Sequence, residues 1–396
     1  MVMARTAPTP SGNCRYYPEK ALAVKGQLTG GPPGARISSS LVPLEGWAVK
    51  AIVYGGPGRF DLRDVPEPGL EPGGLLARVE CCGICGTDYK LYFSENPRFP
   101  PGSILGHEFV ARVEQVSPGA GGFRVGDRVT MATTVPCGAC DLCQRGLPNL
   151  CPTANCVGAA YPGAFAEVIP IAAHAIHMGN VLKVPDGLSS RAAALTEPLS
   201  CVVNAQEIAQ VREGHCVAVV GAGPLGCLHV QVARARGARR VIVVQRSRAR
   251  CALAEGVGAD AVICSEDGDV ASRVKALTGG RGADRVIVCA PDRAAQEQSV
   301  LLAAKGGVVS LFASLPKGAS EITLDSRVIH YGQISVVGCS DSTAAQARDA
   351  LRLLESGAVD AAKLITHEVP LERIVEGIEI MRQRIGLKVL VRVAGA

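Results

Sequence analysis

The sequence predicts an α/β protein in which an irregular β domain is joined to a doubly wound parallel sheet. Three observations support this fold class: short, proline-punctuated strand candidates in the first half, alternating strands and helices in the second, and a glycine-rich loop where the alternation begins. With 396 residues and 47% apolar content, the chain can bury two medium-sized cores.

Composition excludes several classes of protein. The net charge of +5 is small for this length, and no block of like charges indicates a nucleic-acid partner. No apolar run reaches the roughly 18 residues that a membrane span needs. Many of the 16 cysteines stand singly in apolar runs, as Cys216, Cys264 and Cys289 do, which is typical of free thiols in a reducing compartment. We therefore expect a cytoplasmic protein that binds a small-molecule substrate.

The N-terminal residues 1–46 differ in composition from the rest of the chain. They are rich in proline, glycine, serine and threonine and lack periodicity, which predicts a disordered extension. Glu19 is the only acid before Glu45, so a transit peptide is the alternative interpretation.

Turn-bounded strands define a β-rich domain over residues 47–200. The strand candidates cover 49–53, 75–80, 108–116 and 127–131, and helical spacing follows over 189–209.

Strands and helices alternate over the second domain, 201–339, which implies a parallel sheet with helices on both faces. The predicted strands cover 216–220, 241–244, 261–264, 285–289 and 308–312, and the predicted helices cover 225–236, 247–256 and 294–302. The tail, 340–396, continues with helices at 343–355 and 371–382 and strands at 364–369 and 388–393. We expect this tail to return to the first domain.

Four cysteines at short spacing form the most specific motif in the chain. They occupy a lobe over residues 137–151, as Cys137, Cys140, Cys143 and Cys151. Four thiolates can surround one tetrahedral Zn²⁺ and leave no open coordination position. We therefore expect this ion to be structural.

A second group of residues has the composition of an open zinc site. Cys85 and His107 offer the sulfur and the imidazole that Zn²⁺ prefers, and one carboxylate would complete three protein ligands. Both Glu108 and Glu197 qualify as that carboxylate, and the sequence does not choose between them. The fourth position would take water or substrate, and an open-site zinc acidifies an alcohol before hydride departure. The sequence thus predicts two zinc ions per subunit.

Two residues near Cys85 have candidate catalytic roles. The hydroxyl of Thr87 can pass the alcohol proton outward. Asp88 can accept the free N–H of His107 and so fix its tautomer. The simpler structural interpretations are a turn residue for Thr87 and a loop cap for Asp88.

A glycine-rich loop follows the first strand of the second domain. It opens a helix, the context in which a dinucleotide pyrophosphate reaches a helix N-terminus. The predicted coenzyme contacts in this loop are Gly221, Gly223, Pro224, Leu225 and Gly226.

The coenzyme's 2′ position should be recognised about twenty residues further on. An acid there would bind the ribose 2′-hydroxyl of NAD, but the chain carries the neutral Gln245. Gln245 removes the repulsion against a 2′-phosphate, and Arg246, Ser247 and Arg248 could bind one. NADP is therefore slightly favoured over NAD.

Together these motifs resemble the zinc-dependent medium-chain dehydrogenase/reductase superfamily over residues 48–396. The motifs are 83–88, 106–108, 125–129, the four-cysteine lobe and 221–226. Residues 197–200 look like the polyol and threonine dehydrogenase branch. The resemblance implies a GroES-like β-barrel catalytic domain, an inserted Rossmann domain, a cleft between them, and a homodimer or homotetramer. Lys90 stands where many relatives have a histidine that ends a proton relay.

The predicted activity is the zinc-dependent, NAD(P)-linked interconversion of a secondary alcohol, in a polyol, sugar alcohol or cyclitol, and its ketone. An L-threonine 3-dehydrogenase-like activity on an amino alcohol is the alternative within the same chemistry. A non-catalytic zinc- and nucleotide-binding sensor is the alternative from a different class. A sensor predicts a damaged ligand set, whereas all five candidate residues are present, namely Cys85, Thr87, His107, Glu108 and Glu197.

Overall fold

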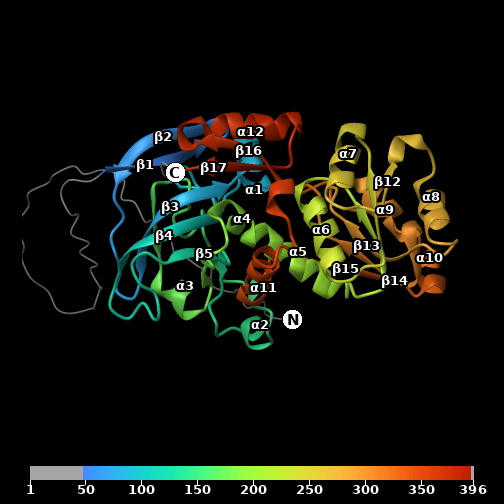
Figure 1. Cartoon of the computed structure of the whole chain (residues 1–396), viewed down its shortest axis with the longest axis horizontal. Coiled ribbons are helices and arrows are strands. Elements are labelled where there is room, and N and C mark those ends of the chain that lie inside the picture. The colour runs from blue at the N-terminus through green and yellow to red at the C-terminus, as the bar shows by residue number, and fades with distance from the viewer. Residues whose placement is uncertain (1–47, 394–396) are drawn as a thin grey trace, which may run out of the picture.

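The computed structural model describes residues 48–393, which form two halves built on two main sheets (Figure 1). The predicted extension over residues 1–46 lies outside the described residues. The first half holds a largely antiparallel sheet and the second a parallel sheet between helices, so the predicted fold class is confirmed. Within 48–393, no helix has both the length and the apolar character needed to cross a membrane.

The main sheet of the first half has the order β16-β17-β3-β4-β5-β9, with β8 also paired to β3. The C-terminal strand β17 pairs antiparallel with β3 and places Leu390 opposite Gly83, so the end of the chain completes the sheet of the first half. The strands of this half are β1 (Ala48–Gly56), β2 (Arg59–Pro66), β3 (Leu75–Gly83), β4 (Glu108–Val116), β5 (Arg128–Met131), β6 (Thr134–Val135), β7 (Asn155–Cys156), β8 (Val168–Ile171), β9 (Val181–Lys183), β16 (Ile365–Pro370) and β17 (Lys388–Arg392).

The sheet of the second half is parallel throughout, in the order β12-β11-β10-β13-β14-β15. The strand order reverses beside β10, and a ligand binds at such a switch point in open α/β sheets. The strands are β10 (Cys216–Val220), β11 (Arg240–Gln245), β12 (Ala261–Cys264), β13 (Ala283–Val288), β14 (Ala303–Leu311) and β15 (Ser335–Gly338). The helices that cover it include α6 (Pro224–Ala235), α7 (Arg248–Gly256), α8 (Val270–Leu277), α9 (Arg293–Leu302) and α10 (Ser326–Gly332).

Strand β10 is apolar at every position because both faces of this sheet are covered. Val217 and Val219 belong to one core, and Ala218 and Val220 belong to the core on the opposite face. The bounds of β4, β10 and β12 match the predicted strands, since an apolar run bounded by turn residues determines such strands locally.

The helical stretch predicted over 189–209 is two helices, α4 (Ser190–Ala193) and α5 (Thr196–Ile208). Pro198 lacks an N–H group and its ring would clash with the carbonyl four residues earlier in a continuous helix, so the helix restarts just before it. Glu197 consequently lies in the first turn of α5.

Helices α8 and α10 are absent from the sequence-based prediction although each has a clear start signal. The side chain of Asp269 accepts a hydrogen bond from the Ala271 amide at the start of α8. Asp325 accepts bonds from the Arg327 and Val328 amides at the start of α10. Aspartate N-caps of this kind satisfy free amides of the first turn and could have located both helices.

The two halves share one hydrophobic core. Helix α5 packs against α11 (Ala344–Glu355), and the cluster around them includes Val110 and Ala132 from the first half and Val217 from the second. Helix α12 (Ile374–Gln383) lies over the first half and α7 over the second (Figure 1). The shared core fixes the relative position of the two halves.

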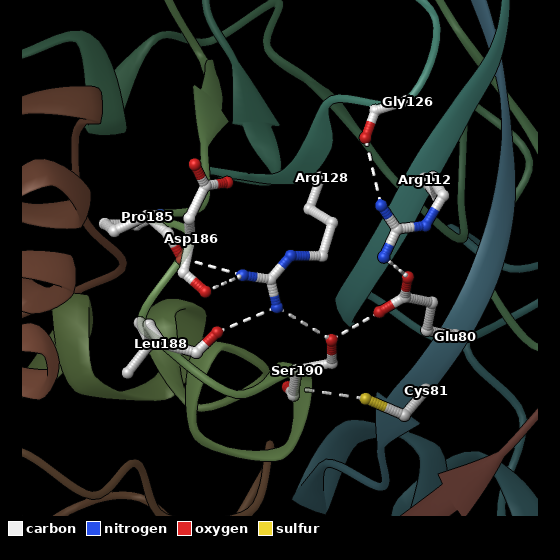
Figure 2. A network of polar contacts seen from close by, with 9 residues as sticks. All are labelled: Glu80, Cys81, Arg112, Gly126, Arg128, Pro185, Asp186, Leu188 and Ser190. Atoms are coloured by element: carbon white, nitrogen blue, oxygen red, sulfur yellow. Dashed lines mark hydrogen bonds and ion pairs between the residues drawn. The ribbon is translucent and has the colours of Figure 1, made fainter. Parts of the chain in front are cut away.

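A polar network holds the segment that leads from β9 into α4 (Figure 2). The Arg128 guanidinium donates bonds of 2.7–3.3 Å to three carbonyl oxygens and one hydroxyl, those of Pro185, Asp186, Leu188 and Ser190. The Ser190 hydroxyl in turn donates to the Glu80 carboxylate, which pairs with Arg112. Arg128 thus positions the segment that precedes Glu197.

We expect Arg128→Leu to lower the free energy of unfolding by about 2 to 4 kcal/mol, because three backbone carbonyls lose a charged donor. Arg112→Leu is the comparison variant, since the half-exposed Arg112 has one ion pair, with Glu80, and one backbone bond, to the Gly126 carbonyl, so its loss should cost about 1 to 2 kcal/mol. Urea unfolding followed by circular dichroism measures both values. Equal losses in the two variants would contradict the role given to Arg128.

Candidate zinc and coenzyme sites

The four cysteines of the 137–151 lobe converge in space. Their sulfur atoms all lie within 4.8 Å of one another. Three of the sulfur–sulfur distances are 3.9 Å for Cys137 and Cys143, 3.5 Å for Cys140 and Cys143, and 3.8 Å for Cys140 and Cys151. A tetrahedral ion with Zn–S bonds of about 2.3 Å requires sulfur separations of about 3.8 Å. The lobe therefore fits one closed zinc site.

Backbone amides prepare this lobe for a cation. The amides of Ala139 and Cys140 donate to the Cys137 sulfur, and these bonds lower the pKa of Cys137 to about 6. The Cys137 amide donates to the Cys151 sulfur at 3.4 Å. Such N–H···S bonds favour the thiolate, which is the form that binds zinc.

The predicted open site forms where β3 ends and β4 begins. The ligand atoms of Cys85, His107 and Glu108 lie within 4.8 Å of one another. Cys85 follows β3 and His107 precedes β4, and the antiparallel pairing places Gly83 opposite Glu108. Burial disfavours the charged imidazole, but Cys85 and Asp88 raise the pKa of His107 well above its usual value. A metal bound by this imidazole displaces its proton.

Asp88 and Thr87 lie in the first turn of α1 (Gly86–Phe93), directly after Cys85. Asp88 is buried, and its carboxylate accepts a 2.8 Å hydrogen bond from the Cys85 amide, so it holds the ligand-bearing turn. The bond to His107 expected from the sequence stays a prediction. Thr87 is half-buried beside the ligand, and Lys90 is exposed one turn further on.

Lys388 is a site residue that the sequence did not reveal. Its ammonium forms an ion pair with Glu108 and donates a 3.0 Å hydrogen bond to the Ile84 carbonyl. The two side chains are 7% and 2% exposed, so the pair is desolvated. A Cβ added to Gly83 would clash with the Glu108 carboxylate, so glycine is required beside this pair. No local motif marks Lys388, because strand β17 alone brings it here.

Glu197 forms a neighbouring group with Cys201 and Asp341, whose ligand atoms lie within 4.8 Å of one another. Burial raises the pKa of Glu197 to about 7, and the charges of Glu108 and Asp341 add to this rise while His107 opposes it. Asp341 has left-handed backbone (φ 57°), and its carboxylate accepts a hydrogen bond from the Thr134 hydroxyl. Cys201 and Asp341 were also missed by sequence analysis.

The glycine-rich loop lies between β10 and α6, at the switch point of the parallel sheet. A Cβ on Gly226 would clash with the Gly221 carbonyl, so this close approach of helix and loop requires glycine. The Gln245 side chain accepts a 2.8 Å bond from the Ala222 amide and joins the end of β11 to the loop. Pro224 and Leu225 begin α6, as expected.

Comparisons with known proteins cover both halves of the chain. Residues 71–186 match the alcohol dehydrogenase GroES-like domain, and residues 224–356 match the zinc-binding dehydrogenase domain. A sorbitol dehydrogenase of Halalkalibacterium halodurans is 35% identical over 81% of this chain and 92% of its own. The chain belongs to the zinc-binding medium-chain dehydrogenases. It is an oxidoreductase that acts on CH–OH donors.

Other medium-chain dehydrogenases with known sequences or structures give the same family. An L-threonine 3-dehydrogenase of Pyrococcus furiosus is 35% identical over 81% of this chain and 90% of its own. A zinc-binding dehydrogenase structure from Sinorhizobium meliloti, bound to NADP, has a TM-score of 0.81 and 31% identity and covers 88% of this chain and all of its own. The resemblance, the GroES-like and Rossmann folds and the enzyme class predicted from the sequence are confirmed.

This medium-chain dehydrogenase also carries residues that fit a dinucleotide. Arg248 pairs with Asp267 at 2.6 Å, and Arg246 is exposed. Arg250 instead faces the loop, because a Cβ built on Gly223 would lie 3.4 Å from its guanidinium. Its buried Nε atom has no hydrogen-bond partner among the described residues. An unpaired guanidinium beside free amides of a helix N-terminus fits a phosphate group.

Proposed function

We propose that this dehydrogenase interconverts a secondary alcohol of a polyol, sugar alcohol or cyclitol with its ketone. When bound, zinc polarises the substrate oxygen and the nicotinamide exchanges a hydride with the substrate carbon. The convergence of Cys85 and His107 with two candidate carboxylates, Glu108 and Glu197, carries this proposal, because three protein ligands would leave one zinc position for a substrate oxygen.

The two carboxylates at this site have different environments. Glu108 is neutralised by the Lys388 ammonium, which makes it a weaker metal ligand. Glu197 forms no direct ion pair among the described residues, although the charges of His107 and Lys388 act on it from nearby. We therefore assign the third ligand, or the group that holds the metal-bound water, to Glu197, and the orientation of the His107 segment to Glu108.

Proton movement is assigned to the residues of helix α1. The Thr87 hydroxyl can accept the alcohol proton and donate its own outward. Lys90 is one helical turn from Thr87 and exposed, so it can pass that proton to water.

The charges around the site support a neutral polyol over an amino acid. Asp341 adds a carboxylate beside Glu197, and Asp88 is buried behind Cys85. The ammonium of Lys388 is already paired with Glu108. The hydroxyl groups of a polyol can donate to these carboxylates, as the ammonium of an amino acid also can, but an amino-acid carboxylate would lie beside like charges without a cation of its own.

L-Threonine is the second candidate substrate, because relatives named L-threonine 3-dehydrogenase are as similar to this chain as the sorbitol dehydrogenase is. Their similarity supports the shared chemistry.

NADP is the proposed coenzyme. Gln245 places a neutral amide at the position of the usual acid, and the exposed Arg246 can bind a 2′-phosphate. Arg248 already forms an ion pair with Asp267, so it should contribute less than Arg246 to binding a 2′-phosphate.

A substrate and coenzyme panel tests the proposed function. Polyols, cyclitols and L-threonine are each assayed with NAD⁺ and NADP⁺ by absorbance of the reduced nicotinamide, using enzyme with two zinc equivalents. We expect a polyol or cyclitol to have a kcat/KM at least about tenfold above that of L-threonine, since one uncompensated charge costs at least about 1.4 kcal/mol. A preference for L-threonine would contradict the proposed polyol substrate. A tenfold preference for NAD⁺ would contradict the coenzyme role proposed for Gln245 and Arg246.

Domain boundaries and assembly remain proposals. We propose domains over 47–200 and 201–339, a C-terminal return over 340–396, and a homodimer or homotetramer. Sedimentation analysis of the full chain tests the assembly, and a monomer would contradict it.

A further inference from the structure

We propose that Arg98 binds a terminal anionic group of the substrate, so that the preferred polyol carries a phosphate ester or a carboxylate at the end remote from the reacting carbon. The inference rests on the proposed polyol dehydrogenase function and names the substrate class of the same site. Arg98 is not one of the candidate zinc ligands, and it belongs to the half of the protein that carries them.

Arg98 lies in the loop that connects Cys85 and α1 to His107. Within this loop the Arg98 amide donates a 3.1 Å hydrogen bond to the side-chain oxygen of Asn96, and the Phe99 amide donates to the Asn96 carbonyl at 2.9 Å. The Phe99 ring packs against the core of the first half. The backbone at Arg98 is therefore held in place, while its side chain is exposed.

Three consecutive contacts join the Arg98 guanidinium to the carboxylates of the open site. Its Nη2 atom donates to the Cys156 sulfur at 3.1 Å, and this sulfur lies 3.5 Å from the Thr134 hydroxyl oxygen. The Thr134 hydroxyl donates in turn to the Asp341 carboxylate. A carboxylate oxygen of Asp341 lies within 4.8 Å of one of Glu197. A path of short contacts therefore leads from the candidate zinc ligands to Arg98.

The positive charge of Arg98 is not neutralised within the part of the chain that the structure describes. No carboxylate between residues 48 and 393 pairs with it, and its side chain donates only to the Cys156 sulfur. A thiol sulfur is a weak hydrogen-bond acceptor, whereas phosphate and carboxylate oxygens form charge-assisted, two-pronged bonds with a guanidinium. An anionic group can therefore replace the sulfur at this guanidinium.

The position of Arg98 selects a remote anionic group and not the carboxylate of an amino acid. In L-threonine the carbon next to the reacting carbon bears the carboxylate, which would therefore lie near Glu197 and Asp341. An extended polyol places its far end further along the contact path, where Arg98 supplies positive charge. Arg98 is thus a specificity-determining residue that does not contact the reacting atoms.

Steady-state kinetics with matched substrates test this assignment. Xylitol and sorbitol, their terminal phosphates and the corresponding aldonates are assayed with the zinc-loaded full chain. We expect at least one anionic form to exceed its neutral parent about tenfold in kcat/KM, in the lower range for a charge-assisted hydrogen bond. Arg98→Gln should remove this preference through a higher KM with kcat unchanged, because the lost contact is the same in the ground state and the transition state.

Arg124→Gln is the matched control, since it removes an exposed arginine that is already paired with Asp127. It should leave the preference intact, and thermal midpoints confirm that both variants are folded. A preference for the phosphate alone or for the aldonate alone identifies which anion Arg98 binds.

The outcomes separate the two proposals. Equal activity on neutral and anionic polyols, or a preference that survives in Arg98→Gln, would overturn the anion subsite while the proposed function stands. An equal loss on neutral and anionic substrates in Arg98→Gln would also overturn it, because the effect would then be structural. Wild-type enzyme that oxidises no polyol, neutral or anionic, would overturn the proposed function and the subsite together.

Discussion

Cys85→Ala should reduce turnover by about a thousandfold or more, because the open site loses its sulfur ligand and with it several kcal/mol of charge stabilisation. The same change should reduce bound zinc from two equivalents per subunit to one. Elemental analysis of the purified protein and an alcohol oxidation assay measure the two effects. The remaining zinc should belong to the four-cysteine lobe, whose ligands are separate in the chain and in space.

Cys143→Ser is the matched control for this experiment. It removes one sulfur of the lobe, so one zinc equivalent is again lost, but the effect should fall on thermal stability because the lobe carries no reacting group. Two full equivalents of zinc in Cys85→Ala, or undiminished turnover, would contradict the open site.

Lys388→Met should destabilise the protein by about 3 to 5 kcal/mol, because the buried Glu108 carboxylate loses its only ion-pair partner among the described residues. The remaining charge also lies beside the ligand His107, so turnover should fall with stability. Denaturant unfolding of zinc-loaded protein gives the change in free energy.

A double variant separates loss of charge balance from loss of packing. Glu108→Gln combined with Lys388→Met removes both charges, so it should be more stable than Lys388→Met alone. If the double variant is less stable than either single variant, the ion pair is not the source of the effect. Lys388→Arg keeps the charge and should retain most of the stability.

The candidate site divides between residues that a local motif identifies and residues that it does not. Cys85, Thr87 and Asp88 stand in one short turn, and the four cysteines fall within fifteen residues, so spacing alone indicates convergence. The third zinc ligand could not be chosen from spacing. That choice depends on Lys388, which neutralises Glu108 from a strand at the other end of the chain.

The same distinction applies to the coenzyme site. Gly221 and Gly226 are predictable from the glycine spacing between a strand and a helix, and the structure adds that the close contact between loop and helix permits no side chain at Gly226. Arg248 was favoured on its position, yet it pairs with Asp267, while Arg250, two residues further along the chain, faces the loop. Which arginine faces the glycine-rich loop depends on how α7 packs on the sheet, and the local sequence does not specify that packing.

The sequence by itself therefore determined the fold class, the four-cysteine lobe and the glycine-rich loop, since each depends on residues close together in the chain. It named the candidates for the open site without choosing the third ligand. The tertiary structure decided how these parts are completed. It brings Lys388 to Glu108 and Asp341 to Glu197 through strand pairing and packing of the two halves. Such contacts join distant segments and leave no periodic or spacing signal, and together they set the charge that substrate and coenzyme meet.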